Sequence, residues 1–138
     1  MSLSVEQKLV IHELLSRAAY AYDERDMAAL EDGFAAAATM SLRIAGGELI
    51  GPFEGRAAIL ELMRNSMAQQ LDVRRHVVSN IFFDESGENP TAISNLTLVT
   101  TADGKAAMLA TGIYHDELVE EGGTWRILKR HVELDSAY

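Results

Sequence analysis

The stretch TAISNLTLVTTADGKAAMLATGIYHDELVEEGGTWRILKRHVELDS, residues 91–136, decides the fold of this chain. It is rich in Val, Ile, Thr and aromatic residues, and two Gly-containing turn signals divide it into the segments 91–103, 105–120 and 124–136. Short turns between segments with a period of two are typical of antiparallel strands. Together with the similar segment 71–84, the stretch predicts four long strands in a meander.

The part of the chain before this meander has a helical period. Apolar residues recur at intervals of three and four from Val5 to Tyr22, which predicts an amphipathic helix. Ser4 is placed as its N-cap, and Gln7 is placed to complete a capping box. We expect two further helices, a short one from Asp26 to about Ala36 and one over 56–69.

The region between these two helices shows turn signals instead. Residues 37–50 surround Gly46-Gly47 and predict a short hairpin, and Gly51-Pro52 predicts a break. Helices that precede a meander pack on one face of its sheet, which gives an α+β fold. A sheet that curls round helices leaves a pocket at its open end, where small-molecule sites tend to form. We expect one domain, residues 1–138.

Composition excludes several classes of function. The formal net charge of -9 disfavours nucleic acid and anionic lipid, which bind clustered cations. The absence of cysteine excludes disulfides, thiolate metal sites and a cysteine nucleophile. Residues 1–15, MSLSVEQKLVIHELL, carry charges within their apolar run and resemble neither a signal peptide nor a membrane span. We therefore expect a soluble, cytoplasmic protein.

Asp23, at the end of the first predicted helix, and His76, in the first predicted strand of the meander, are the candidate catalytic pair. If the fold brings them together in an apolar cavity, the carboxylate orients the imidazole and stabilises its charged form, which makes the ring a general base. A general base also needs donors that stabilise an oxyanion or a departing anion, and Tyr22, Tyr114 and Arg130 are available. The four histidines show no metal-ligand spacing, so we expect neither a metal nor a cofactor.

Several segments in this order resemble the SnoaL-like branch of the nuclear-transport-factor-2-like superfamily. They are AYDERDMAAL (21–30), GRAAI (55–59), RHVVSN (75–80), GIYHDEL (112–118) and GTWRILKR (123–130). The resemblance implies a cone-shaped α+β barrel, in which N-terminal helices pack in the concave face of a curved, mainly antiparallel mixed sheet. The family includes scytalone dehydratase, hexachlorocyclohexane dehydrochlorinase, polyketide cyclases, steroid isomerases and the small subunits of ring-hydroxylating dioxygenases.

The resemblance also implies roles for single residues. Asp23 and His76 match the dyad of the dehydratase and the dehydrochlorinase, Tyr22 matches a substrate-binding tyrosine, and Arg130 matches an arginine near the cavity. This chain has Asn95 at the position of the dehydratase's second histidine. It has Ala18, Ala110 and Gly112 at the positions of other substrate-binding groups in these relatives. These departures support a reaction class more than a substrate.

The resulting hypothesis is a cofactor-free lyase or isomerase that acts on a small apolar alicyclic or polyketide-like compound in an internal cavity. Its catalytic residues are Asp23 and His76, and its substrate-binding residues are Tyr22, Asn80, Asn95, Tyr114 and Arg130. Alternating apolar residues on both faces of the strands also predict a homodimer or higher homo-oligomer through the sheet.

Two alternatives to an enzyme remain open, a small-molecule-binding protein that uses the same cavity and a structural subunit that resembles the small subunit of a dioxygenase. At the level of residues, Asp23 has the alternative role of ending the first helix. The alternative role of the tyrosines is to pack in the core. Asn80 and Asn95 have the alternative role of satisfying hydrogen bonds of backbone groups in the sheet.

Overall fold

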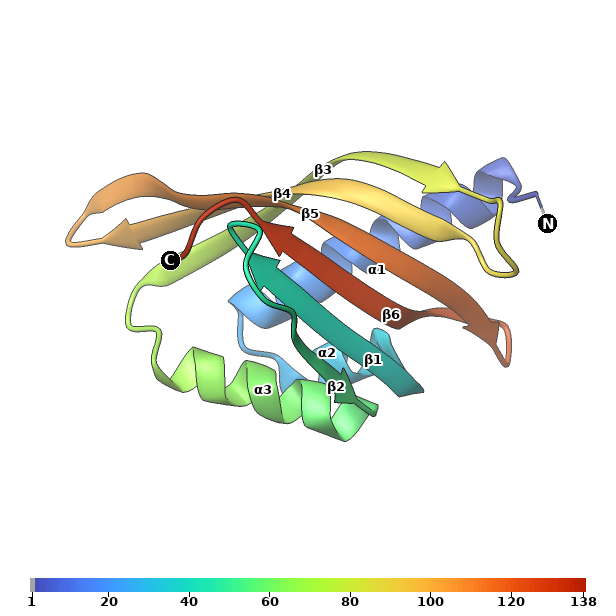
Figure 1. Cartoon of the computed structure of the whole chain (residues 1–138), viewed down its shortest axis with the longest axis horizontal. Helices are drawn as coiled ribbons and strands as arrows, with labels where there is room; N and C mark the ends of the chain where they lie inside the picture. The colour runs from blue at the N-terminus through green and yellow to red at the C-terminus, as the bar shows by residue number, and fades with distance from the viewer. Residues whose placement is uncertain (1) are drawn as a thin grey trace.

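A six-stranded sheet with helices against one of its faces forms the framework of the computed structural model, which describes residues 2–138 (Figure 1). The elements in chain order are α1 (Val5–Asp23), α2 (Met27–Asp32), β1 (Phe34–Ile44), β2 (Ile50–Glu54), α3 (Arg56–Ala68), β3 (Val73–Asp84), β4 (Thr91–Ala102), β5 (Lys105–Glu121) and β6 (Thr124–Leu134). The four long strands of the predicted meander are β3 to β6. The α+β class predicted from the sequence is confirmed.

The sheet has the strand order β2-β1-β6-β5-β4-β3 and is mixed. The meander pairs are antiparallel, whereas β1 runs parallel to β6 and joins the N-terminal half of the chain to its C-terminal half. The sheet curves but does not close on itself, because β2 and β3 are free edges (Figure 1). The expected barrel is therefore an open, curved sheet.

The first helix begins and packs as its sequence indicates. The Ser4 side chain accepts a hydrogen bond from the backbone N–H of Gln7, and the Gln7 side chain accepts one from the backbone N–H of Ser4, so the predicted capping box is present. Ile11, Leu15 and Ala18 lie on the buried side of the helix. This apolar side holds α1 against the concave face of the sheet, where its last turn reaches β3.

The predictions for residues 26–50 were partly wrong. Asp26 caps α2 as expected, but the helix ends at Asp32 and residues 34–36 already belong to β1. Alanine favours helix, yet burial of Phe34 and Ala35 together with pairing to β6 outweighs that preference. The predicted hairpin is present as the antiparallel pair of β1 and β2, and Gly51-Pro52 lies within β2 instead of forming a break.

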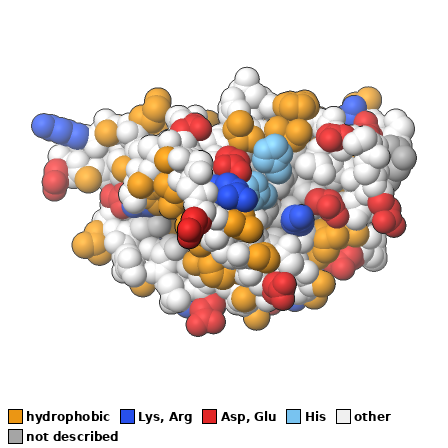
Figure 2. Space-filling model, in the orientation of Figure 1, with side chains coloured by type: hydrophobic (Ala, Val, Ile, Leu, Met, Phe, Trp, Pro, Cys, Tyr) orange, Lys and Arg blue, Asp and Glu red, His pale blue; other side chains and the backbone are white. Residues whose placement is uncertain are grey.

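The two faces of the sheet differ in composition. Side chains of the concave face, such as Leu96, Tyr114 and Val132, are buried beneath the helices. In Figure 1 α1 passes behind the sheet, so Figure 2 shows the opposite, outer face, where histidine side chains gather near the middle among acidic and basic groups. No helix in the part of the chain that the structure describes has the length and hydrophobicity of a membrane-spanning segment.

Candidate active site

A cavity of about 150 Å³ lies between α1, α3 and the concave face of the sheet. Most of its wall is apolar, with side chains from all three helices and from β1, β3, β4, β5 and β6. Its polar lining residues are Tyr22, Ser66, His76, Tyr114, Arg130 and Tyr138. A mostly apolar space with a few convergent polar groups is the usual form of a small-molecule site.

The structure brings Asp23 and His76 together at one side of this cavity. Oδ1 of Asp23 lies 2.5 Å from Nδ1 of the His76 ring, and Oδ2 accepts a 2.8 Å hydrogen bond from the His76 backbone N–H. Asp23 closes α1, and His76 lies in β3, so one carboxylate joins the helix end to the strand. The Asp23 side chain is only 5% exposed and that of His76 13% exposed.

This contact determines which ring nitrogen is free. A carboxylate only accepts hydrogen bonds, so Nδ1 of His76 carries the hydrogen that points to Asp23. The neutral ring then keeps Nε2 as an acceptor. His76 lines the cavity and Asp23 does not, so the carboxylate holds the ring from outside the cavity.

Tyr22 packs against this pair from the last turn of α1. Its ring meets the His76 ring edge-on, with 4.9 Å between centroids. The amide of Gln70 donates a 3.1 Å hydrogen bond to the Tyr22 hydroxyl. Burial raises the pKa of Tyr22 above 10.0 despite this hydrogen bond, so the phenol stays neutral.

A second polar group lies on β5 and β6. Nε and Nη2 of Arg130 donate to the two carboxylate oxygens of Asp116 at 2.7 and 3.0 Å, and both side chains are buried. The guanidinium lies 4.1 Å from the centroid of the Tyr114 ring. Burial opposes the charge of Arg130, but Asp116 outweighs that effect and the pKa of the guanidinium is raised. Burial raises the pKa of Tyr114 to about 12, so its hydroxyl remains a donor.

Two donors of this group have no partner within the protein. Within residues 2–138, neither Nη1 of Arg130 nor the Tyr114 hydroxyl has a hydrogen-bond partner in the protein. In this range, Oγ of Ser94 is the one side-chain N or O atom that is fully buried and has no partner. Nη1 of Arg130 and the Tyr114 hydroxyl are therefore not fully buried. Arg130 and Tyr114 both line the cavity.

A comparison with protein families identifies the chain. The model of the SnoaL-like domain matches residues 4–131. The chain belongs to the SnoaL-like family. None of the curated proteins matches it.

Solved structures share the SnoaL-like fold over nearly the whole chain. A Nostoc punctiforme protein with a cystatin-like fold is 21% identical, with 98% of this chain and 96% of that chain covered and a TM-score of 0.81. A Catenulispora acidiphila protein, solved in complex with S-DNPA, is 22% identical, with 96% of each chain covered and a TM-score of 0.81. ActVI-ORFA from Streptomyces coelicolor is 19% identical, with 93% and 96% covered and a TM-score of 0.79. At these identities the likeness establishes the fold.

Two of the residues expected to bind substrate lie away from the SnoaL-like cavity. Asn95 is exposed on the outer face, because the alternation along β4 turns Leu96 and Leu98 inward. Asn80 is exposed at an irregularity of β3, where its φ of 56° accompanies a shift of register between Ser79 and Phe82. The expectation that these side chains line the site is corrected. Tyr22, Tyr114 and Arg130 do line it.

Three residues around the SnoaL-like cavity were missed from the sequence: Asp116, Gln70 and Tyr138. Asp116 lies within the quoted GIYHDEL segment and faces the inward-pointing Arg130, so opposite charges on neighbouring strands were the available signal. Nothing in the sequence indicates that Gln70 contacts Tyr22 or that Tyr138 lies against the cavity. Within residues 2–138, no three His, Asp or Glu side chains form a cluster that could hold a metal ion.

Proposed function

We propose that this SnoaL-like protein is a cofactor-free lyase or isomerase in which His76, oriented by Asp23, removes a carbon-bound proton from a small apolar substrate. The observation that carries the proposal is the double contact of the Asp23 carboxylate with His76, at 2.5 Å to Nδ1 and 2.8 Å to the backbone N–H, beside an apolar cavity. A ring held in this way has one tautomer and one orientation, as a general base requires.

The proposed reaction begins at a carbon next to a carbonyl group. Nε2 of His76 takes the proton, and the electron pair of the C–H bond moves into the carbonyl, whose oxygen becomes negative. The carboxylate of Asp23 stabilises the imidazolium that forms. The enolate then expels a leaving group from the neighbouring carbon, either a hydroxyl, which takes the imidazolium proton and leaves as water, or a halide, after which the imidazolium loses its proton to solvent. Alternatively, the imidazolium returns its proton to another carbon of the enolate. The first outcome is elimination and the second is a shift of the double bond.

Tyr114 and Arg130 supply the donors that this chemistry needs. Nη1 of Arg130 and the Tyr114 hydroxyl are free to donate to an oxygen in the cavity, and such preorganised donors stabilise charge as it develops. Asp116 already neutralises the guanidinium, so the donor side carries no net charge. This balance favours an oxygen that becomes negative only during the reaction, such as that of a ketone, over a permanent carboxylate.

The comparisons support the type of substrate. The family resembled from sequence includes polyketide cyclases and dehydratases, and the Catenulispora acidiphila protein of the same fold was solved with a small molecule, S-DNPA. An alicyclic or polyketide-like compound would match the mainly apolar wall of the cavity.

Exchange of carbon-bound hydrogen tests the proposal without knowledge of the natural substrate. Cyclic enones, β-hydroxyketones and halogenated alicyclic ketones are incubated with the protein in D₂O, and deuterium incorporation and elimination are followed by NMR. The wild-type protein should accelerate exchange or elimination of at least one compound, and His76→Ala should not. Equal rates for the two proteins would contradict the proposal.

A small-molecule-binding protein is the second candidate. The apolar cavity and the ligand-bound structure of the same fold favour it equally. The same compounds distinguish the two functions. A binding protein should show slower amide hydrogen exchange around the cavity when a compound is bound, but it should not exchange the carbon-bound hydrogens of that compound.

We also propose a homodimer through the outer face of the sheet. Val77 and Phe82 of β3 and Ile113 of β5 are 46%, 58% and 38% exposed on strands whose neighbouring residues point inward. A second copy would cover these apolar groups with the same patch. Sedimentation velocity should show a dimer that dissociates in Phe82→Glu, and a monomeric wild-type protein would contradict this assembly.

A further inference from the structure

The aromatic side chain of Tyr138 lies against the cavity although it is far from buried. Tyr138 belongs to the lining of the cavity, yet the residue is 57% exposed. A residue that touches both the cavity and solvent stands at the mouth. Tyr20, by contrast, is 69% exposed but does not line the cavity.

Arg74 of β3 provides the support for this ring. Its guanidinium carbon lies 5.2 Å from the centroid of the Tyr138 ring, a cation–π distance. Nε of Arg74 donates to both oxygens of Asp72 at 3.2 and 3.0 Å, and Thr100 donates a further hydrogen bond to Asp72. The hydrogen bond from Thr100, together with Arg74, holds the pKa of Asp72 below 3.8, so the carboxylate stays charged and fixes Arg74.

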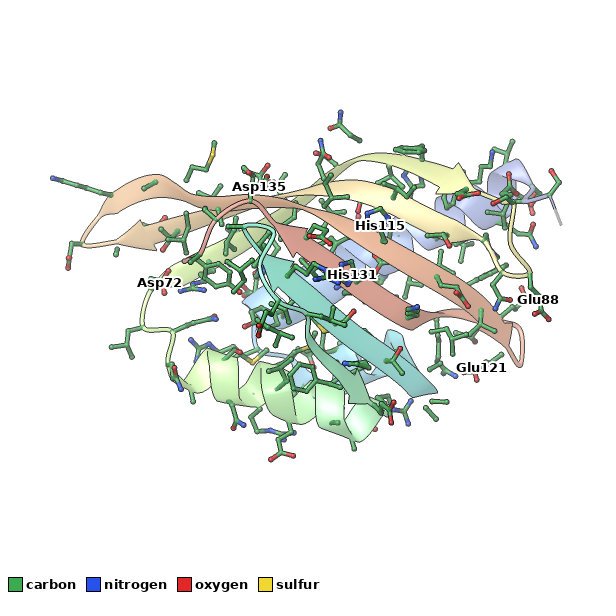
Figure 3. The ribbon with its side chains drawn as sticks, viewed as in Figure 1. Asp72, Glu88, His115, Glu121, His131 and Asp135 are labelled. Carbon is green, nitrogen blue, oxygen red and sulfur yellow. The ribbon has the colours of Figure 1, made fainter. Side chains whose placement is uncertain are left out.

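The backbone that precedes Tyr138 is also held in place, at Asp135. The Asp135 amide donates to the Thr111 carbonyl at 2.9 Å, and the Thr111 hydroxyl donates to Asp135 at 2.7 Å. The segment 136–138 therefore runs from a fixed point at the end of β6 to the connection between α3 and β3, near Asp72 (Figure 3). The contact of the ring with Arg74 lies beyond this fixed point.

We infer that Tyr138 is a specificity-determining residue that closes the cavity when its ring rests on Arg74 and admits a ligand when the ring leaves. Ligands that extend past the mouth would have to displace the ring, so the contact limits the size of compound that the closed cavity holds. A single cation–π contact at a partly exposed site is weak, so the ring can open and close readily. The inference concerns access to the cavity and goes beyond the proposed function, because access does not depend on catalysis.

Acylation of His76 measures access without a ligand. Diethyl pyrocarbonate is a small neutral reagent that modifies unprotonated imidazole, and peptide mass spectrometry follows each histidine separately. His12 on α1 does not line the cavity and serves as the internal reference. In Tyr138→Ala the ratio of the His76 rate to the His12 rate should rise about twofold to fivefold, the change expected from loss of one partly exposed cation–π contact.

Three further variants complete the test. Arg74→Met should raise the ratio in the same direction, because the ring loses its support. Tyr138→Phe should leave the ratio unchanged, since the ring alone is needed, and Tyr20→Ala is the matched control on an exposed tyrosine outside the cavity. The inference is overturned by an unchanged ratio in both Tyr138→Ala and Arg74→Met, or by an equal rise in Tyr20→Ala. Loss of global structure would raise the His12 rate as well, so the ratio is read in variants that keep the wild-type His12 rate, and Arg74→Met decides the test if Tyr138→Ala does not fold.

Discussion

The sheet carries two histidine–carboxylate pairs, one on each face. On the concave face, Nδ1 of His76 lies 2.5 Å from the nearly buried Asp23. On the outer face, Nε2 of His131 lies 2.7 Å from the partly exposed Glu133, and Nδ1 lies 2.7 Å from the Ser41 hydroxyl. The His131 ring is close to that of His115, and both point to the outer side of the sheet (Figure 3).

The two pairs differ at the ring nitrogen that does not contact the carboxylate. Both nitrogens of His131 have protein partners, so neither can take a proton from a substrate without breaking a hydrogen bond. Among residues 2–138, by contrast, Nε2 of His76 has no hydrogen-bond partner, and His76 lines the apolar cavity. A histidine–carboxylate contact is therefore a weak sign of a general base by itself, and a free second nitrogen beside a cavity is the stronger sign.

Removal of each imidazole should give the largest contrast between the faces. His76→Ala should lower the rate of deuterium exchange or elimination by about 10²–10⁴-fold, the usual contribution of a general base. His131→Ala should leave that rate unchanged. Equal losses in the two variants, measured by NMR on the same compound, would break the distinction.

Neutralising each carboxylate should give a smaller contrast. Asp23→Asn keeps the shape of the side chain but removes the charge that stabilises the imidazolium, and we expect a rate loss on the order of 10²-fold. Glu133→Gln is the matched change on the outer face and should have no effect on the rate. An active Asp23→Asn protein would show that Asp23 only anchors α1 to β3.

Tyr114 on the concave face should also make the free energy of unfolding depend on pH in the alkaline range. Because burial raises the pKa of Tyr114 from 10.0 to about 12, the folded protein holds the phenol proton more tightly than the unfolded chain does. This stabilisation is complete below about pH 10 and is lost as the pH rises to about 12, a change of about 2 to 3 kcal/mol.

Urea unfolding of the wild-type protein and of Tyr114→Phe at several pH values measures this effect. The variant lacks the titrating group, so its free energy of unfolding should fall less between pH 10 and 12 than that of the wild type. Parallel curves for the two proteins would mean that the phenol titrates alike in the folded and unfolded states.

The smallest effect is expected from the hydrogen bond beneath His131. Ser41→Ala removes the 2.7 Å contact with Nδ1 and should lower the free energy of unfolding by about 1 kcal/mol. The exchange rate should stay at the wild-type value. A loss of activity in Ser41→Ala would show that the outer histidine contributes to the chemistry after all.

The sequence predicted the α+β class, the SnoaL-like family and all four meander strands, each of which lines the cavity. These depend on patterns that span many residues, namely helical period, strand alternation and turn signals. The limits of single elements were less predictable. Phe34-Ala35-Ala36 reads as helix from local preference and forms strand because β6 pairs with it.

Residue positions failed where the strands change register. Asn80 follows His76 and Val78 at intervals of two and would point inward in a regular strand, but the irregularity at Asn80 turns Ile81 and Phe83 inward instead. The Gly122-Gly123 turn alone would pair Asp116 with Lys129, whereas a shift of register between Glu117 and Leu118 pairs it with Arg130. No local pattern marks either shift, so residue spacing alone could not place Asp116 opposite Arg130, and their opposite charges were the one available signal.

The parallel pairing of β1 with β6 has a consequence for folding. Met40 pairs with Arg130 and Leu42 with Val132, contacts between residues far apart in the sequence. Closing so long a loop is entropically costly, and folds rich in such contacts tend to fold slowly. Since Met40, Leu42, Arg130 and Val132 all line the cavity, its walls can meet only after β6 has been synthesised. During translation, α1 and the pairing of β3, β4 and β5 can therefore form before the chain has a binding site.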